Sequence, residues 1–191
     1  MTHPDAERWN ARYAADGEVW LERQPRQLLL EYTHLLPQQG IALDAAAGVG
    51  KNGAYLARHG LNVIALDISM IGLQLARQRA LAESLPLSTA VYDLANLWLP
   101  ADFFDLIVNF HFLERATFAE FRQALKSGGL LIFETFLRSN DDTPTPDFYL
   151  EPGELLNAFE DFEIIHWKER TIPGTSKVTA QLVARKPNAP V

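Results

Sequence analysis

The chain has 191 residues, of which 48% are hydrophobic and 21% charged, values that fit one soluble globular domain and exclude a disordered or fibrous chain. Its 24 acidic and 17 basic residues give a net charge of -7, so the chain as a whole repels a nucleic-acid backbone. The absence of cysteine excludes disulfides, thiolate metal sites and cysteine nucleophiles.

The N-terminal segment MTHPDAERWNARY is polar and charged, and it lacks the apolar core of a signal peptide. Apolar runs elsewhere are far shorter than a membrane span. The five histidines include no i, i+4 pair, so no histidine metal site is expected. These features predict a soluble, cytoplasmic protein with no metal and with neither a membrane nor a nucleic acid as partner, and they leave the oligomeric state open.

Residues 1–39 are expected to form a helical region ahead of the sheet, with helices over 4–17 and 24–36 divided by the segment EVWLERQP. Two alternatives stay open: this region packs on the sheet edge, or it covers the ligand crevice as a lid. Aromatic faces suit a sulfonium or an apolar acceptor, which gives four lid candidates. These are Trp9, Arg12, Tyr13 and Trp20.

From residue 40 to 185, short apolar runs rich in branched residues alternate with helical patterns. The runs predict strands over 41–47, 62–68, 87–93, 104–110, 130–136, 162–168 and 177–185. The helical patterns cover 53–60, 70–84, 115–129 and 151–160. Ser69 is the expected N-cap of the second helix, and glycine is expected to end the third.

The order of these elements predicts the fold. Strand, helix and strand in repetition indicate parallel pairing with right-handed crossovers, whereas only ERTIPGTS separates the last two strands, which therefore form an antiparallel hairpin. We expect one α/β domain over residues 1–191, a doubly wound, mostly parallel seven-stranded sheet with a C-terminal antiparallel hairpin and helices on both faces. The polar segment 138–147 is expected to be a loop over the substrate side.

The segment after the first strand contains GVGKNG, residues 48–53, a literal G-x-G-x-x-G. Ligands of open parallel sheets bind beyond the carboxyl ends of the strands, where this segment lies. Asp44, just ahead of the glycines, would repel a dinucleotide pyrophosphate but attract the cationic methionine end of S-adenosylmethionine. The alternative is that Asp44 only caps the amides of the loop. Gly53 fits helix packing better than a phosphate contact.

LDAAAGVG resembles the first motif of the seven-stranded Rossmann-like methyltransferases, an acidic residue followed by glycines at alternate positions. Asp44, Gly48 and Gly50 match it, whereas Ala46 replaces its first glycine. The resemblance covers residues 40–185 and implies that these four positions and Asn52 bind S-adenosylmethionine. Ala46 either weakens that site or marks an activity that has been lost.

Later positions agree with the same family. Asp67 matches the acidic residue that holds both ribose hydroxyls, and Ile68 matches the residue that presses on the adenine. Asp93 matches the acid that accepts the adenine amino group, with the N–H of Leu94 beside the ring. The resemblance therefore assigns the nucleoside half of the cofactor to the ends of the second and third strands.

FDLIVNFHFLE resembles the fourth-strand motif, which implies that Asn109 and Phe110 lie beside the methyl group. NFHF lacks both prolines of N/D-P-P-Y/F, which argues against methylation of DNA adenine or of glutamine. His111 is a candidate general base, with pocket lining as its alternative role. Glu134 is a candidate for orienting the substrate, with packing or an ion pair as its alternative role.

GKNGAYLARHG, WNARY and PDFYLEPGELLNAF look like segments of the tellurite-resistance-type and thiopurine-type small-molecule methyltransferases. This resemblance implies direct in-line methyl transfer from S-adenosylmethionine to a small molecule, through a soft sulfur, selenium or tellurium atom or to another small metabolite. A non-catalytic, S-adenosylmethionine-binding regulatory domain is the alternative. An NAD-dependent oxidoreductase is a further one, against which Asp44 and the final hairpin argue.

Overall fold

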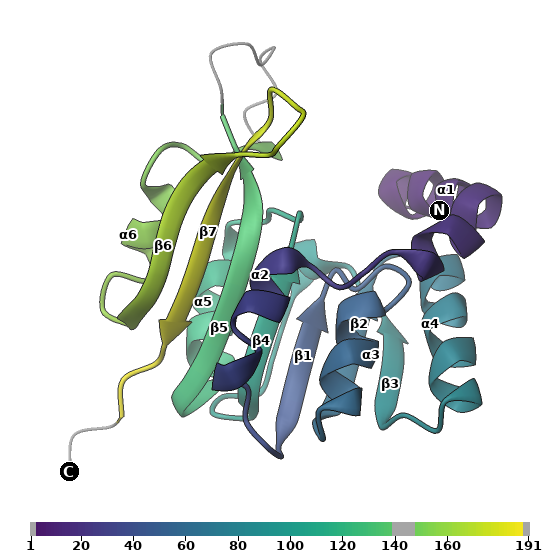
Figure 1. Ribbon diagram of the computed structural model, residues 1–191, viewed down its shortest axis with the longest axis horizontal. Helices are drawn as coiled ribbons and strands as arrows, with labels where there is room; N and C mark the ends of the chain where they lie inside the picture. Colours follow the sequence, from purple (N-terminus) through teal and green to yellow (C-terminus); the bar gives the residue numbers. More distant parts are fainter. Residues whose placement is uncertain (1–2, 139–147, 189–191) are drawn as a thin grey trace. The chain divides into compact units, whose positions relative to one another are not determined.

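The computed structural model describes residues 3–138 and 148–188 (Figure 1). These residues form two compact units, the first ending at Leu97 and the second beginning at Trp98. Each unit has its own buried apolar side chains, with Leu43 and Leu56 fully buried in the first and Phe121 and Phe133 in the second. The single domain expected over residues 1–191 stays a prediction.

The first unit contains three parallel strands in the order β3-β2-β1. They are β1 (Ile41–Ala45), β2 (Asn62–Asp67) and β3 (Leu87–Val91). The crossovers between them carry α3 (Lys51–Arg58) and α4 (Met70–Ala82), as the alternation of patterns predicts (Figure 1). All three loops that follow these strands therefore leave the same edge of the sheet.

Local chemistry fixes where the two crossover helices begin. Ser69 is the N-cap of α4, because its Oγ accepts a hydrogen bond from the Gly72 amide at 3.1 Å, which confirms the expected cap. Gly50 is the N-cap of α3 and has a left-handed φ of 66°, a conformation that glycine adopts without strain. β3 ends earlier than expected, because Asp93 caps the short 3-10 helix η2 (Leu94–Asn96).

The N-terminal helices differ from their expected bounds. α1 (Pro4–Glu22) continues through the expected divider, with a kink at Asp16, where φ is -125° and ψ is 16°. The second expected helix is reduced to α2 (Gln27–Glu31) and the 3-10 helix η1 (Thr33–Leu35). Thr33 Oγ1 donates back to the carbonyl of Leu30 at 2.8 Å, a local bond that competes with continued α-helix.

α1 packs chiefly on α4 rather than on the edge of the sheet. The glycine at position 17 permits this close approach, since a Cβ there would lie 2.6 Å from Leu75 Cδ1. The Arg79 guanidinium also donates to the carbonyl of Leu21, near the end of α1. This contact concerns α1 alone, so both expected alternatives for residues 1–39 stay predictions.

The second unit contains four strands in the order β4-β5-β7-β6. They are β4 (Phe104–Phe110), β5 (Leu125–Leu137), β6 (Glu163–Thr171) and β7 (Val178–Arg185). β4 and β5 are parallel, whereas β7 is antiparallel to both of its neighbours, so the expected C-terminal hairpin is confirmed. With the first unit this gives all seven expected strands.

The helices of the second unit are α5 (Ala116–Ala124) and α6 (Glu154–Ala158). α5 does not end on glycine, as its pattern had predicted, because Leu125 already pairs with Phe104 and begins β5. A shift of register between Phe104 and Leu106 accommodates this early start.

The loop expected over 138–147 lies outside the described residues, apart from Arg138. Within the described ranges, no helix has both the length and the hydropathy needed to cross a bilayer.

Candidate functional site

Asp44 lies in β1 and is 1% exposed. Its Oδ2 accepts a hydrogen bond from the Gly53 amide at 2.7 Å. A Cβ at Gly53 would lie 3.0 Å from that same oxygen, so this glycine serves packing, as expected. Burial raises the pKa of Asp44 to about 7. The carboxyl group therefore fixes the first turn of α3 and titrates near neutral pH.

Asp67 at the end of β2 joins two loops. Its Oδ2 accepts from the Gly48 amide at 2.7 Å, and its Oδ1 accepts from the Ser69 amide at 2.8 Å. Burial raises the pKa of this carboxyl. Each carboxylate oxygen has two lone pairs, so both oxygens can accept another donor, such as a hydroxyl. The residue thus fixes the glycine loop and can still bind a diol.

The loop after β1 places alternate residues in the left-handed region: φ is 54° at Ala46, 56° at Gly48 and 66° at Gly50. Glycine adopts this conformation freely, whereas alanine pays about 1–2 kcal/mol for it. Ala46, which stands where the family motif has glycine, therefore carries backbone strain in addition to the extra methyl group expected from the sequence.

Tyr13 of α1 covers the glycine loop. A Cβ at Gly48 would lie 2.5 Å from Tyr13 Oη, and one at Gly72 would lie 2.9 Å from its ring. Burial, followed by the charge of Asp67, raises the pKa of the Tyr13 hydroxyl. A cofactor that lies against the backbone of Gly48 must therefore contact this phenol or displace it.

The four lid candidates form one cluster on α1. The ring of Tyr13 lies 5.5 Å from that of Trp9 and 5.7 Å from that of Trp20. The guanidinium of Arg12 lies 5.2 Å from the centre of the Trp9 ring and 4.9 Å from that of Trp20. A groove of about 500 Å³ runs from Tyr13 past Gly17 to Leu75, between α1 and α4.

The remaining predicted residues of the first unit occupy capping or packing positions. Asn52 is buried, and its Oδ1 accepts from the Arg26 amide at 3.0 Å. Asp93 accepts from the Ala95 amide at 3.0 Å, and Leu94 is buried beside it. Ile68 is half-buried, directly after Asp67.

Asn10 is a residue of this region that sequence reasoning missed. Its Oδ1 accepts from Ser69 Oγ at 2.8 Å and from the Ile71 amide at 3.1 Å. It therefore joins α1 to the start of α4, next to the residue that bonds Asp67. Asn10 belongs to the segment WNARY, but the prediction of a lid covers only the aromatic and basic residues of that segment.

His111 and Glu134 form a pair in the second unit. His111 follows β4 with a φ of 59°, and its amide donates to the carbonyl of Glu134 at 2.7 Å. Its Nε2 lies 3.0 Å from Glu134 Oε1, and the two side chains are 19% and 11% exposed. A left-handed histidine costs about 1–3 kcal/mol, and such strain persists most often at functional sites.

Gln181 completes this pair and was also missed. It lies opposite Glu134 in the register of β5 and β7, and its Nε2 donates to Glu134 Oε2. The relay therefore runs from histidine to glutamate to glutamine across neighbouring elements. No sequence signal identifies Gln181, because its place depends on which strand pairs with β5.

The surroundings of the relay are aromatic and buried. The rings of His111 and Phe136 are 4.5 Å apart. Asn109 is fully buried, and its Nδ2 donates to the Phe112 carbonyl at 2.9 Å. Its Oδ1 has no hydrogen-bond partner among the described residues. Phe110 is also buried, at the end of β4.

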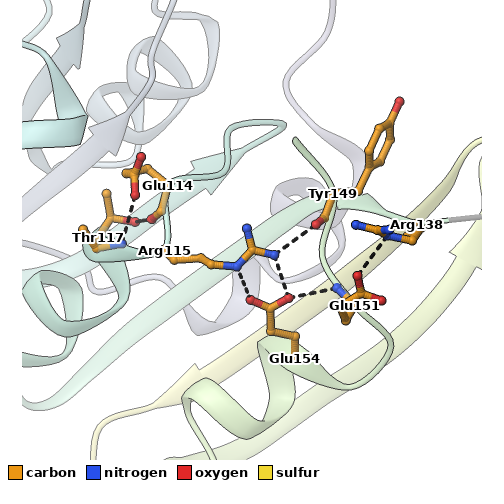
Figure 2. A network of polar contacts seen from close by, with 8 residues as sticks. Glu114, Arg115, Thr117, Arg138, Tyr149, Glu151 and Glu154 are labelled. Carbon is orange, nitrogen blue, oxygen red and sulfur yellow. Dashed lines mark hydrogen bonds and ion pairs between the residues drawn. The ribbon is translucent and has the colours of Figure 1, made fainter. Parts of the chain in front are cut away.

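Figure 2 shows the ion-pair network that connects α5, α6 and the end of β5. Arg115 pairs with Glu154 at 2.6 Å and donates to the carbonyl of Tyr149 at 3.1 Å. Arg138 pairs with Glu151 at 2.9 Å, and the Glu151 amide donates to Glu154 at 2.8 Å. These contacts hold Tyr149, whose ring lies 6.5 Å from that of Phe136.

Comparison with known proteins identifies the fold. Residues 42–129 match a family model described as a methyltransferase domain. The chain is 29% identical over 136 residues to the probable S-adenosyl-L-methionine-dependent methyltransferase TehB of Haemophilus influenzae, which covers 66% of this chain and 47% of the relative. The chain thus spans about half the length of this curated relative.

Two solved structures have the same fold. The crystal structure of TehB from Haemophilus influenzae gives a TM-score of 0.71 at 24% identity, covering 83% of this chain and 61% of that one. The structure of phosphoethanolamine N-methyltransferase 2 of Haemonchus contortus, in complex with S-adenosyl-L-methionine, gives a TM-score of 0.71 at 16% identity. The match covers 85% of this chain and 52% of that one. The Rossmann-like methyltransferase fold expected from the sequence is confirmed.

Proposed function

We propose that this chain, which has the Rossmann-like methyltransferase fold and matches a methyltransferase family model over residues 42–129, transfers a methyl group from S-adenosylmethionine to a small molecule by direct in-line displacement. The observation that carries the proposal is the carboxylate of Asp67, which fixes the Gly48 loop through one oxygen and the start of α4 through the other. This arrangement suits a ligand that has a vicinal diol and no phosphate.

The first unit binds the cofactor in this proposal. Asp67 accepts the ribose hydroxyls, Ile68 contacts the adenine, and Asp93 and the amide of Leu94 bind its polar edge. Gly48 and Gly50 offer bare backbone, as Ala46 does in part. The charge of Asp44 stabilises the cationic methionine end of the cofactor. Because the pKa of Asp44 is about 7, the bound cation in turn raises the ionised fraction of this carboxyl. Asn52 supports the loop from α3.

The cluster of Trp9, Arg12, Tyr13 and Trp20 acts as a lid over the bound cofactor. Its support is Tyr13, which already lies on Gly48. The lid excludes water and presents aromatic faces to the sulfonium. For Asn109 and Phe110, the position beside the methyl group that the resemblance implies stays a prediction.

The relay of His111, Glu134 and Gln181 supports a role in proton removal. When bound, the cofactor supplies an electrophilic methyl group on a sulfonium that is a good leaving group. Glu134 holds His111 through Nε2, and His111 takes the proton of the acceptor. A hydroxyl, thiol or amine acceptor needs this base, whereas an anionic sulfur, selenium or tellurium atom does not.

The proposal is tested by measuring S-adenosylhomocysteine formed from S-adenosylmethionine with a panel of thiols, selenols, a tellurium oxyanion, amines and carboxylic acids. We expect turnover with at least one class. In the same assay, His111→Gln should lower turnover of a protic acceptor. The matched control is His166→Gln, which changes a histidine of β6 outside the relay. Cofactor binding without turnover of any member would overturn the enzymatic proposal and favour a regulatory domain.

A further inference from the structure

The ring of Phe136, near the end of β5, meets groups from three other segments of the second unit. The ring of His111, which follows β4, lies 4.5 Å from it. The ring of Tyr149 lies 6.5 Å from it, in an edge-to-face arrangement. The ammonium of Lys177, just before β7, lies 5.2 Å from the centre of the Phe136 ring. We call these four residues the Phe136 cluster, and among them only His111 has a role in the proposed function.

The ring at the centre of this cluster lies on the same face of the sheet as the histidine relay. Successive side chains of a strand point to opposite faces, so Glu134 and Phe136 share one face. Their partners in the register of β5 and β7 are Gln181 and Thr179. The opposite face of β5, which includes Phe133, packs against α5. Sheet geometry therefore places Phe136 beside the relay rather than in the layer between the sheet and that helix.

The network of Figure 2 fixes Tyr149 in its place. The Arg115 guanidinium donates to the carbonyl of Tyr149 at 3.1 Å and pairs with Glu154. The Leu150 amide donates to the carbonyl of Phe136 at 2.9 Å, which ties this segment to β5. The ring of Tyr149 points away from Arg115, and the residue is half-buried. The main chain is thus held by its neighbours, and the ring forms an aromatic wall beside Phe136.

Lys177 adds a positive charge to this wall. Its side chain is exposed, and within residues 3–138 and 148–188 it forms no ion pair. Its carbonyl accepts from the Ile172 amide at 2.8 Å, so the hairpin fixes the point from which the side chain extends. A contact between an exposed ammonium and an aromatic face is weak, whereas a charge-assisted hydrogen bond to a carboxylate is stronger. Lys177 can therefore bond an anionic group that lies against Phe136.

We propose that the Phe136 cluster binds the methyl acceptor and that this acceptor is a phenol that carries a carboxylate group. The inference rests on the proposed function and narrows its acceptor to one class. Phe136 and Tyr149 pack against the aromatic ring of the acceptor, and Lys177 binds its carboxylate. His111, which lies against the same Phe136 ring, serves its hydroxyl group.

The relay gives the reason for a hydroxyl rather than a softer nucleophile. A phenol has a pKa of about 10, so only about one molecule in 1,000 is ionised at pH 7, and a base is needed. The phenolic oxygen forms a bond to the methyl carbon, and the bond from that carbon to the sulfonium sulfur breaks with its electron pair on sulfur. The phenolic proton passes to His111, which Glu134 holds. The products are an aryl methyl ether and S-adenosylhomocysteine.

Steady-state kinetics with charged and uncharged phenols tests the role of Lys177. The para and meta isomers of hydroxybenzoate carry the carboxylate, whereas para-hydroxybenzamide has a similar shape without the charge. We expect turnover of at least one hydroxybenzoate. Lys177→Met should raise KM for that substrate by about 10- to 100-fold and leave kcat within about threefold, because only binding is lost. It should leave KM for the benzamide unchanged. Arg77→Met, which removes an exposed cation of α4, should alter neither constant.

Two variants of Tyr149 test the aromatic wall. Tyr149→Ala should raise KM for the charged and the uncharged phenol alike by about 3- to 10-fold, the range for a contact between aromatic rings. Tyr149→Phe keeps the ring and should leave both values unchanged.

Three results would overturn the inference. In Lys177→Met, they are an equal rise of KM for the charged and the uncharged phenol, or no rise for either. The third is turnover of another class of acceptor by the wild-type chain without turnover of any phenol, which would leave the proposed function intact. If no acceptor of any class is turned over, the proposed function fails, and this inference fails with it.

Discussion

The cofactor loop of the first unit and the histidine relay of the second are built from different interactions. In the first unit, carboxylates are held by backbone amides: Asp44 by Gly53 and Asp67 by Gly48 and Ser69. In the second, the side chain of Glu134 is held by two other side chains, those of His111 and Gln181. One region fixes the shape of the chain, and the other fixes the orientation of a titratable group.

This difference separates binding from chemistry. Backbone amides are fixed by the fold of the chain and do not titrate, which suits the site of a cofactor common to many reactions. A side-chain relay sets the orientation of one base and affects only reactions that need a proton removed. Substitutions in the two regions should therefore change different measured constants.

The largest expected effect is on turnover. His111→Gln should lower kcat for a protic acceptor by about 100- to 10,000-fold, because general-base catalysis contributes that much. Gln181→Leu should lower it by about tenfold, since it only orients Glu134. Steady-state kinetics over a range of pH measures both. The cofactor affinity of each variant should match that of the wild type, and a parallel loss of affinity would contradict the separation of the two regions.

The next largest effect is on cofactor affinity. Asp67→Ala removes two hydrogen bonds to a charged acceptor, each contributing about 1.5–3 kcal/mol, so affinity for S-adenosylhomocysteine should fall at least about 100-fold. Glu134→Ala is the matched control from the other region and should change it less than about threefold. Equal effects in a calorimetric titration would refute the assignment of Asp67.

Asp44 should produce a pH dependence of intermediate size. Its pKa is about 7 in the folded chain against 3.8 in the reference state, so the folded state binds an extra proton between these values. The free energy of unfolding should therefore fall as the pH rises from about 4 to 7, by a few kcal/mol at most. Cofactor affinity should rise over the upper part of that window as the carboxyl ionises.

Asp44→Asn keeps the acceptor for the Gly53 amide but removes the ionisation. Urea unfolding at several pH values should show that the free energy of unfolding of this variant changes less with pH than that of the wild type. The cofactor affinity of the variant should no longer rise through pH 7. Asp102→Asn changes an exposed aspartate and provides the control. If Asp44→Asn leaves the pH dependence of the free energy of unfolding unchanged, the Asp44 carboxyl does not titrate between about pH 4 and 7, and the prediction is contradicted.

The smallest effect concerns the strained position 46. Ala46→Gly relieves about 1–2 kcal/mol of left-handed strain but gives the unfolded chain more freedom, so it should stabilise the protein by at most about 1 kcal/mol. Ala47→Gly is the control next to it, without a positive φ, and should destabilise by about 1 kcal/mol. Equal losses in the two variants would show that Ala46 carries no strain.

The sequence predicted the parts of the site that depend on short stretches of chain. The sequence indicates Asp44 and Asp67 because each lies near the carboxyl end of a strand, ahead of a loop, and it indicates all seven strands from their apolar runs. Tyr13 was a lid candidate, but its contact with Gly48 follows from the packing of α1 on α4. Gln181 lies 47 positions from its partner Glu134, and the order of the strands alone brings the two together. Long-range packing of this kind leaves no periodic signal in the sequence.

Calorimetric titration of the wild-type chain with S-adenosylhomocysteine and, separately, with NADH tests the central claim most directly, because the glycine loop spells a dinucleotide motif while Asp44 and Asp67 favour a phosphate-free ligand. We predict saturable binding of S-adenosylhomocysteine and no heat of binding for NADH. Binding of NADH without binding of S-adenosylhomocysteine would contradict the account.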